Sequence, residues 1–195
     1  MMKSDIDYAQ MQLELDKYFR MIPQGDKQDI IRRALELGER TALEYRSEDL
    51  KQAFIDAGYR IEYTKNVDHV VKQGLLMRAE IIEDNLGKRV LIYKDSIELA
   101  LADLAKQGLN SNAEQIENLY LAHEFFHLLE MDEHITDYVL HIKVERLKLL
   151  GKTFYGRLSS PSEIASNRFA QCVCQCDFNP LLIDDLFIGG CDDSN

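Results

Sequence analysis

Residues 119–129 read Leu-Tyr-Leu-Ala-His-Glu-Phe-Phe-His-Leu-Leu, an apolar run that contains three ionisable side chains. Its length and apolar character predict a central buried helix. In a helix, positions i and i+4 lie on one face with their Cβ atoms about 6 Å apart. The imidazoles of His123 and His127 can therefore reach one metal ion at about 2.0–2.1 Å. Glu124, beside the first histidine, can then hold and deprotonate a metal-bound water.

Two other interpretations of this run involve no metal. The helix could simply bury three polar groups, or it could be the relic of a site that has lost its ion. Burying ionisable side chains among leucines and phenylalanines costs several kcal/mol when they have no partner. A metal removes this cost, so the sequence favours a metal site.

A catalytic site of this kind needs a third protein ligand and an open position for water. The metzincin spacing would place a glycine at position 130 and a histidine at 133, but Glu130 and Glu133 stand there and His134 is out of register by one. Glu163 is the better candidate, because it opens a second predicted helix 36 residues after His127. The helix dipole alone also favours a glutamate in a first turn. A histidine pair that still lacks a carboxylate ligand makes the ligand role the stronger interpretation.

Asn167 lies one turn after Glu163 on the same helix face. We expect it to accept a hydrogen bond from a ligating imidazole, as metal-bound histidines require. Tyr138, His141 and Tyr155 lie between the two motifs and could stabilise an oxyanion, although each is expected to be a packing or surface residue.

The pair His-Glu-Phe-Phe-His (123–127) and Glu-Ile-Ala-Ser-Asn-Arg-Phe-Ala (163–170) resembles the motifs of the ImmA/IrrE family of metallopeptidases. That family has H-E-x-x-H followed by a helix reading roughly E-x-x-A-N-x-F-A, and the resemblance covers about residues 58–180. It implies a gluzincin-type site, with His123, His127 and Glu163 as zinc ligands and Glu124 as the general base.

Family members of known function are anti-repressors that cleave a helix-turn-helix repressor at one site. The resemblance therefore implies a similar target here. Two departures concern the substrate groove: Ser166 stands where the family commonly has alanine, and Cys-Gln-Cys-Asp-Phe-Asn-Pro at 174–180 replaces the usual apolar-Leu-x-Pro stretch. The gap between the two motifs is also long.

The expected function is that of a zinc-dependent endopeptidase acting on a protein, with one Zn²⁺ ion as cofactor. Mn²⁺, Fe²⁺ and Co²⁺ also suit two histidines and a glutamate. The alternatives are a metal-stabilised regulatory protein that sequesters a repressor or toxin partner without cleaving it, and a zinc hydrolase with a non-protein substrate. An extended substrate is expected to pair with a strand edge beside the active helix.

The chain of 195 residues has a formal net charge of −11, of which residues 1–60 carry −2 and residues 61–195 carry −9. This charge repels phosphate backbones, so direct nucleic-acid binding is not expected and a neutral or basic protein is a better partner. No basic helix-turn-helix is evident, so a repressor would be a separate chain. The N-terminus lacks a signal-peptide pattern and no apolar run approaches the roughly 20 residues of a membrane span. The expected location is cytoplasmic, with no membrane contact.

The four cysteines are Cys172, Cys174, Cys176 and Cys191. The first three form C-x-C-x-C, which is too tight for a disulfide framework and favours reduced thiols over a metal or redox role. On a helix, only Cys172 and Cys176 would share a face.

The predicted fold is α+β, a small antiparallel sheet of about three strands packed on a helical bundle that contains the H-E-x-x-H helix. Residues 1–57 are expected to form an N-terminal helical segment packed on the main domain, 58–190 the zinc metallopeptidase domain, and 191–195 an acidic tail. Periodicity and turn signals predict strands at 60–64, 75–82 and 89–93, with a turn at 85–88. Residues 135–150 fit neither period, 151–161 read as a loop and 181–188 as a short apolar end.

Helices are predicted by apolar spacing and by caps. They cover 5–21, 26–46, a segment capped by Ser47 that ends at Ala57, a segment capped by Asp95 or Ser96 that ends near Lys106, a segment opened by a capping box at Ser111–Glu114 that ends near Met131, and a segment of 161–176 capped by Ser160 or Ser162.

Overall fold

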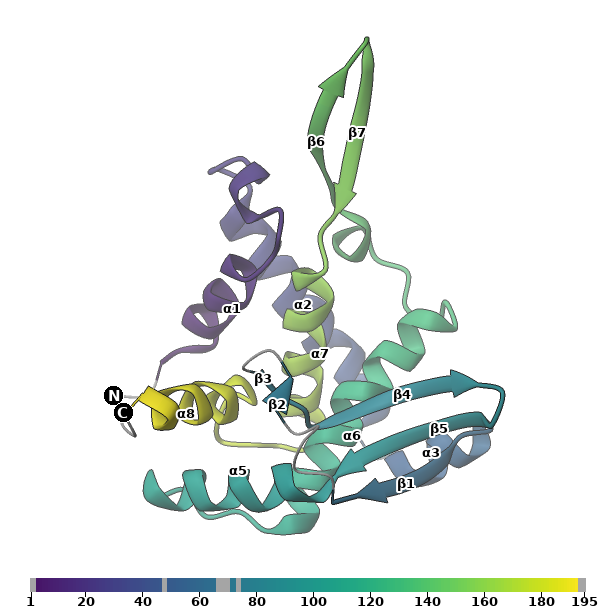
Figure 1. The fold of residues 1–195 in the computed structure, drawn as a ribbon, viewed down its shortest axis with the longest axis vertical. Coiled ribbons are helices and arrows are strands. Elements are labelled where there is room, and N and C mark those ends of the chain that lie inside the picture. Colours follow the sequence, from purple (N-terminus) through teal and green to yellow (C-terminus); the bar gives the residue numbers. More distant parts are fainter. Residues whose placement is uncertain (1–2, 47–48, 66–70, 73–74, 193–195) are drawn as a thin grey trace.

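The computed structural model describes residues 3–46, 49–65, 71–72 and 75–192. It confirms the α+β class: a three-stranded sheet lies against helices grouped around α6 (Ala113–Met131) and α7 (Ser160–Val173) (Figure 1). No helix in these ranges is long and apolar enough to cross a membrane.

The sheet has the order β1-β5-β4, formed by β1 (Arg60–Thr64), β5 (Gly87–Tyr93) and β4 (Ala79–Asp84). The predicted β4–β5 hairpin is confirmed as antiparallel, but β1 pairs with β5 in parallel, so the sheet is mixed. Alternation of apolar residues places a strand without giving its direction, and the direction here follows from β1 lying beside β5 and not beside β4.

The strand predicted at 75–82 is divided. β3 (Leu75–Leu76) pairs with β2 (Val71–Lys72), and β4 begins only at Ala79. Between them the Arg78 side chain forms an ion pair with Asp184, far along the chain. This contact takes Arg78 out of the period-two pattern.

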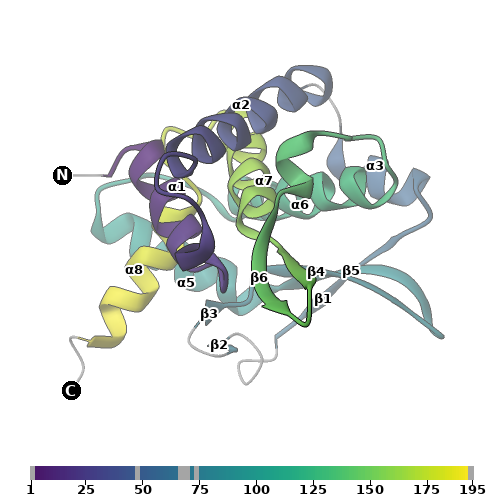
Figure 2. The same cartoon turned by 90° about the horizontal axis from the view of Figure 1, so that it is seen from above.

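Helix α2 (Lys27–Tyr45) packs along α7, and α6 packs on α7 as well (Figures 1 and 2). Gly38, inside α2, allows the close approach: a Cβ there would lie 2.3 Å from the carbonyl oxygen of Ala165 and 2.9 Å from the backbone nitrogen of Phe169. The glycine that weakens α2 as an isolated helix is therefore what lets it pack against α7.

The N-terminal helix is shorter than predicted. α1 (Asp5–Glu14) ends well before residue 21 and is followed by the 3-10 turn η1 (Phe19–Met21). Leu15 is 70% exposed, whereas Leu13 is fully buried. The chain turns because Asp16 points inward and accepts hydrogen bonds from backbone groups at the start of α7.

α3 (Leu50–Asp56) and α5 (Lys94–Lys106) follow the predicted pattern, with different caps, whereas α8 (Leu181–Asp192) is a helix where only a short apolar end was expected. Asp49 caps α3, and the predicted cap Ser47 lies outside the described residues. α5 has no side-chain cap, because the Ser96 hydroxyl bonds the Tyr93 carbonyl instead. The capping box of α6 is Asn112 with Gln115, one residue later than predicted.

Residues 138–157 form structure that the sequence did not resolve. After the 3-10 turn η2 (Tyr138–His141), β6 (Lys143–Leu149) and β7 (Lys152–Arg157) make an antiparallel hairpin that projects from the rest of the fold (Figure 1). The expected loop at 151–161 is thus mostly strand. Leu150 and Gly151 make the turn with positive φ of 50° and 74°, and a leucine at such a position is not a hairpin signal.

The described buried apolar residues form one core, which includes side chains of α2, α6 and α7. The domain boundary at 57/58 stays a prediction. Of the expected acidic tail, residues 191–192 belong to α8, and 193–195 lie outside the described residues.

Candidate metal centre

The tertiary structure brings His123, His127 and Glu163 together, two of them from α6 and one from the first turn of α7. One ligand atom from each lies within 4.8 Å of the others, so the group could hold a metal ion. Nε2 of His123 is 3.2 Å from Nε2 of His127. The Glu163 carboxylate oxygens lie 3.5 Å and 3.6 Å from the two Nε2 atoms.

These separations match the edges of a metal coordination shell. Two ligand atoms bound tetrahedrally at about 2.05 Å lie about 3.3 Å apart. The three observed distances, 3.2, 3.5 and 3.6 Å, therefore leave room for one ion without rearrangement of the side chains. Three protein ligands would leave a fourth position open.

Two serines of α7 determine which ring nitrogen of each histidine carries its proton. Ser166 Oγ donates to the Glu163 carbonyl oxygen at 2.9 Å, so it is the acceptor for His123 Nδ1 at 3.2 Å. Ser162 Oγ donates to Glu130 Oε2 at 2.5 Å, and accepts from His127 Nδ1 at 3.3 Å. Each neutral imidazole is then protonated at Nδ1 and directs its Nε2 lone pair toward the other.

Two facing lone pairs at 3.2 Å repel each other unless a cation lies between them. The pKa of His127 reflects this need for positive charge. Burial alone would lower the pKa of His127, but the nearby carboxylates of Glu130, Glu163 and Glu124 outweigh burial and raise it. A divalent ion between the two nitrogens would supply that positive charge.

Glu163 is held as a carboxylate. Burial alone would raise the pKa of Glu163, but the adjacent His123, together with His127 and Arg78, lowers it to about 2. The balance is reversed at Glu124, where burial outweighs the two histidines and the pKa is raised. The two glutamates of the site thus differ as an anionic ligand and a proton-accepting base should.

The first turn of α7 is held in place from the other end of the chain. Asp16 Oδ2 accepts hydrogen bonds from the backbone N–H groups of Ser159 (2.8 Å) and Ser160 (3.0 Å). The predicted caps Ser160 and Ser162 do not act as caps, and the N-cap residue Ser159 makes no side-chain capping bond. An aspartate 143 residues away satisfies the orphan N–H groups at this helix start instead.

A cavity on each side of the ligand group gives access to it. One of about 220 Å³ is lined by His123, Glu124 and Glu163 together with Arg78 and β4 residue Ala79. The other, of about 310 Å³, is lined by His127, Glu130, Ser162 and the base of the β6–β7 hairpin. An extended ligand can therefore reach the group from two directions.

The role expected of Asn167 falls to Ser166. Asn167 Nδ2 donates to the Glu163 carbonyl oxygen at 2.8 Å and contacts neither imidazole. Its Oδ1 is buried and has no hydrogen-bond partner within the described part of the chain, although the residue lines the cavity of His123 and Glu124. That oxygen is an acceptor available to a bound ligand.

Sequence reasoning also missed Arg78, the cationic residue of that cavity lining. Its only signal in the sequence was an arginine inside an otherwise apolar strand pattern. Tyr138, His141 and Tyr155, the oxyanion donors considered from the sequence, line neither cavity. Tyr138 and Tyr155 are 69% and 61% exposed.

The three described cysteines do not form a second metal group. Cys172 lies in α7, which ends at Val173, so Cys174 and Cys176 do not continue its face and the expected Cys172–Cys176 face is not formed. All three are free thiols, and burial raises the pKa of Cys174 to about 12 and of Cys176 to about 11.

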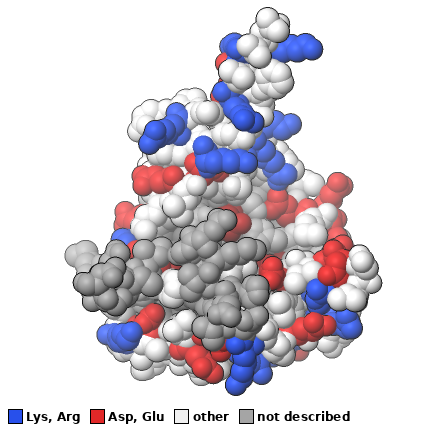
Figure 3. Space-filling model, viewed as in Figure 1, with Lys and Arg blue, Asp and Glu red and all other residues white. Residues whose placement is uncertain are grey.

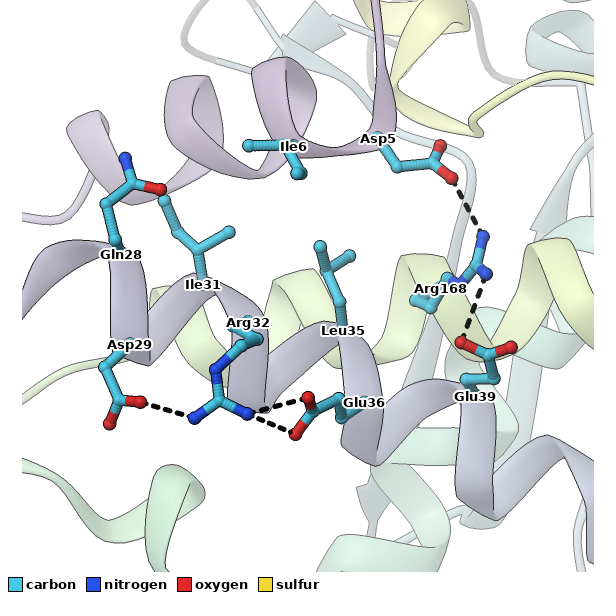
Figure 4. A pocket seen from close by; sticks show the side chains of 10 residues that line it. All are labelled: Asp5, Ile6, Gln28, Asp29, Ile31, Arg32, Leu35, Glu36, Glu39 and Arg168. Carbon is cyan, nitrogen blue, oxygen red and sulfur yellow. Dashed lines mark hydrogen bonds and ion pairs between the residues drawn. The ribbon is translucent and has the colours of Figure 1, made fainter.

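A larger hollow of about 490 Å³ lies between α1, α2 and α7, away from the ligand group (Figure 4). Its cations are paired within its own wall, Arg32 with Asp29 and Glu36, and Arg168 with Asp5 and Glu39. The Arg168 pairs link α7 to α1 and α2, whereas the Arg32 pairs lie within α2.

No family model, curated protein or solved structure matches this chain.

Proposed function

We propose that the protein is a zinc-dependent endopeptidase. The observation that carries the proposal is the convergence of the two Nε2 lone pairs and the Glu163 carboxylate on one point, with Glu124 in the adjoining cavity. Two histidines and one carboxylate with an open fourth position are a typical catalytic zinc ligand set.

Zinc bound here would polarise the scissile carbonyl and lower the pKa of a bound water toward about 7. Glu124 accepts the proton of the attacking water and returns it to the leaving amine. Its raised pKa suits this exchange, because a carboxylate that is a very weak base would take up the proton poorly. Arg78, held in the cavity wall by its ion pair with Asp184, is the candidate for stabilising the oxyanion, since it is the cation that shares this wall with His123, Glu124 and Glu163.

Two features favour a peptide as the substrate. β4 is paired only with β5 among the described strands and contacts α6, so its outer edge can accept an extended chain beside the site. The Asn167 Oδ1 acceptor can receive a main-chain N–H of that chain. Both features recognise a backbone rather than a particular side chain.

The proposed substrate is a helix-turn-helix repressor on a separate chain, which makes the protein an anti-repressor of the ImmA/IrrE kind. This part of the proposal comes from the two sequence motifs at 123–127 and 163–170. The departures at Ser166 and at 174–180 lie on or directly after α7, beside the site.

The test compares wild type with Glu124→Gln on the helix-turn-helix regulator encoded nearest to the gene. We expect wild type to cut the regulator once, and the variant to bind zinc equally but to cleave at least about 100-fold more slowly. Glu114→Gln, an exposed change of the same kind in the first turn of α6, is the control and should cleave normally.

Tight binding without cleavage by wild type would refute the peptidase and support the sequestering alternative. Zinc stoichiometry in Glu163→Ala tests the ligand set separately. Unchanged stoichiometry and affinity in that variant would remove Glu163 from the site.

A further inference from the structure

The β6–β7 hairpin differs in charge from the rest of the molecule. Residues 143–157 contain five lysines and arginines against one glutamate, a net charge of +4. Since the whole chain has a net charge of −11, the residues outside the hairpin carry −15. Figure 3 shows blue side chains over the projecting hairpin. All five cations are exposed, and no ion pair is recorded for Lys143, Arg146 or Lys152 among the described residues.

One face of the hairpin is apolar and uncovered. Leu147 pairs with Phe154 and Leu149 with Lys152, and side chains of such alternate pairs lie on the same face of a ribbon. Leu147, Leu149 and Phe154 are 52%, 55% and 49% exposed. A lone two-stranded ribbon that exposes three large apolar side chains is typical of a surface awaiting a partner.

The base of the hairpin, unlike its exposed tip, packs closely against the rest of the fold. Gly156 packs so closely on the Tyr18 ring that a Cβ would lie 2.4 Å from it, and its cross-strand partner Val144 is buried. Arg157 Nε donates to the Leu140 carbonyl oxygen at 2.8 Å. The ribbon therefore projects in a defined direction from the body.

The same base reaches the metal ligands. Arg157 Nη2 donates to Glu130 Oε1 at 2.7 Å, and Ser162 donates to the other oxygen of Glu130. Ser162 in turn contacts His127 Nδ1. Arg157 also lines the 310 Å³ cavity with His127 and Glu163. A chain bound along the hairpin is thus led directly to the ligand group.

We propose that the β6–β7 hairpin is a docking arm for the protein substrate, and that it takes a substrate segment in which acidic residues accompany apolar ones. The proposal rests on the proposed function, because it assigns the arm to the same site. The rest of the protein, with its net charge of −15, suits a neutral or basic surface on the remainder of that substrate.

The chemistry of the arm favours a protein over nucleic acid or lipid. Groove readers present hydrogen-bonding side chains to base edges, whereas this ribbon presents Leu147, Leu149 and Phe154. The turn does carry the exposed leucines Leu149 and Leu150, but Lys148 and Lys152 stand beside them at the same end, where insertion into a bilayer would bury their charges. Aromatic, apolar and cationic side chains together are the usual composition of a protein interface.

The experiment measures binding of a fluorescein-labelled peptide of ten residues, alternating glutamate with leucine or phenylalanine, to the zinc-loaded Glu124→Gln protein, which leaves the peptide intact. Control peptides carry lysine for glutamate, or serine for the apolar residues. We expect the acidic apolar peptide to bind at least about tenfold more tightly than either. Lys152→Glu and Leu147→Ser should each weaken it about five- to tenfold. Lys106→Glu, an exposed reversal on α5, should not.

Equal binding of the lysine peptide would overturn the proposal. So would tighter binding of a 20-base-pair duplex or of phosphatidylserine vesicles, or dimerisation abolished by the hairpin variants. Both hairpin changes are at exposed positions, and retained zinc binding shows that the variants fold.

Cleavage of the regulator separates the two proposals. If the peptide binds the arm but nothing is cleaved, the peptidase fails and the docking surface stands. If the regulator is cleaved equally by wild type and by Lys152→Glu/Leu147→Ser, the arm fails and the peptidase stands.

Discussion

Substitution of Ser166 by alanine should weaken zinc binding although Ser166 is not a ligand. The change removes the acceptor 3.2 Å from His123 Nδ1 and leaves that N–H without a partner. Ser166 is fully buried, so bulk water has no direct access to replace its oxygen. A buried donor without a partner costs about 1–3 kcal/mol. Loss of such an orienting contact lowers metal affinity about 10- to 100-fold.

The matched substitution Ser162→Ala should cost less. It removes the acceptor of His127 Nδ1, but Glu130 Oε2 already lies 3.9 Å from that nitrogen and can move to accept its proton. We expect at most a tenfold loss there, against at least tenfold for Ser166→Ala.

The measurement is a competitive zinc titration against a chelator of known affinity, together with urea unfolding of the metal-free protein. The Glu163 carbonyl keeps its bond from Asn167 when Ser166 is replaced. In the metal-free variant His123 can also carry its proton at Nε2, 3.5 Å from the Glu163 carboxylate, whereas zinc holds the proton at Nδ1. Metal-free stability should therefore change by less than about 1 kcal/mol. Zinc affinity of Ser166→Ala within twofold of wild type, or a larger loss in Ser162→Ala, would refute the assignment of the two serines.

Two further predictions concern the packing and the start of α7. Gly38→Ala should destabilise the protein by about 2 kcal/mol, because overpacking against the Ala165 carbonyl exceeds the gain in helix propensity. Its melting temperature should fall by about 4–8 °C, while Gly25→Ala, with nothing within 4 Å, should change little; a Gly38→Ala protein as stable as wild type would contradict the close packing. Asp16→Asn should cost about 1–2 kcal/mol at pH 7, since it weakens the charged acceptor of the Ser160 N–H. Burial alone would raise the pKa of Asp16, but these backbone hydrogen bonds lower it, so its contribution is present above the unfolded pKa and lost as pH falls through the folded one. Urea unfolding from pH 7 to pH 2 should show the unfolding free energies of wild type and Asp16→Asn converging in acid. A constant difference between them would show that the charge of Asp16 does not contribute to stability.

Local patterns predicted the elements whose contacts are close in sequence. The run at 119–129 carries its own helical period, and the helix it predicted is α6, with His123 and His127 one turn apart. The β4–β5 hairpin likewise follows from two apolar strands and the turn between them. In these cases the residues that interact are neighbours, so spacing alone specifies the geometry.

The β6–β7 hairpin was missed because it has neither a buried face nor a standard turn. Leu147 and Leu149 alternate with Lys148 but are exposed like it, and Leu150 takes the positive φ usually left to glycine or asparagine. Periodicity detects burial, and this ribbon buries little beyond its base.

By itself the sequence determined that two histidines and a neighbouring glutamate share a buried helix, and that Glu163 begins another. Only the tertiary structure decided that Ser166, and not Asn167, orients His123, and that Asp16 caps α7 from 143 residues away. Helical spacing defines which residues of one element share a face. The rotation and depth at which two helices pack depend on every side chain between them, including the absent one at Gly38, and that sum cannot be read from either helix alone.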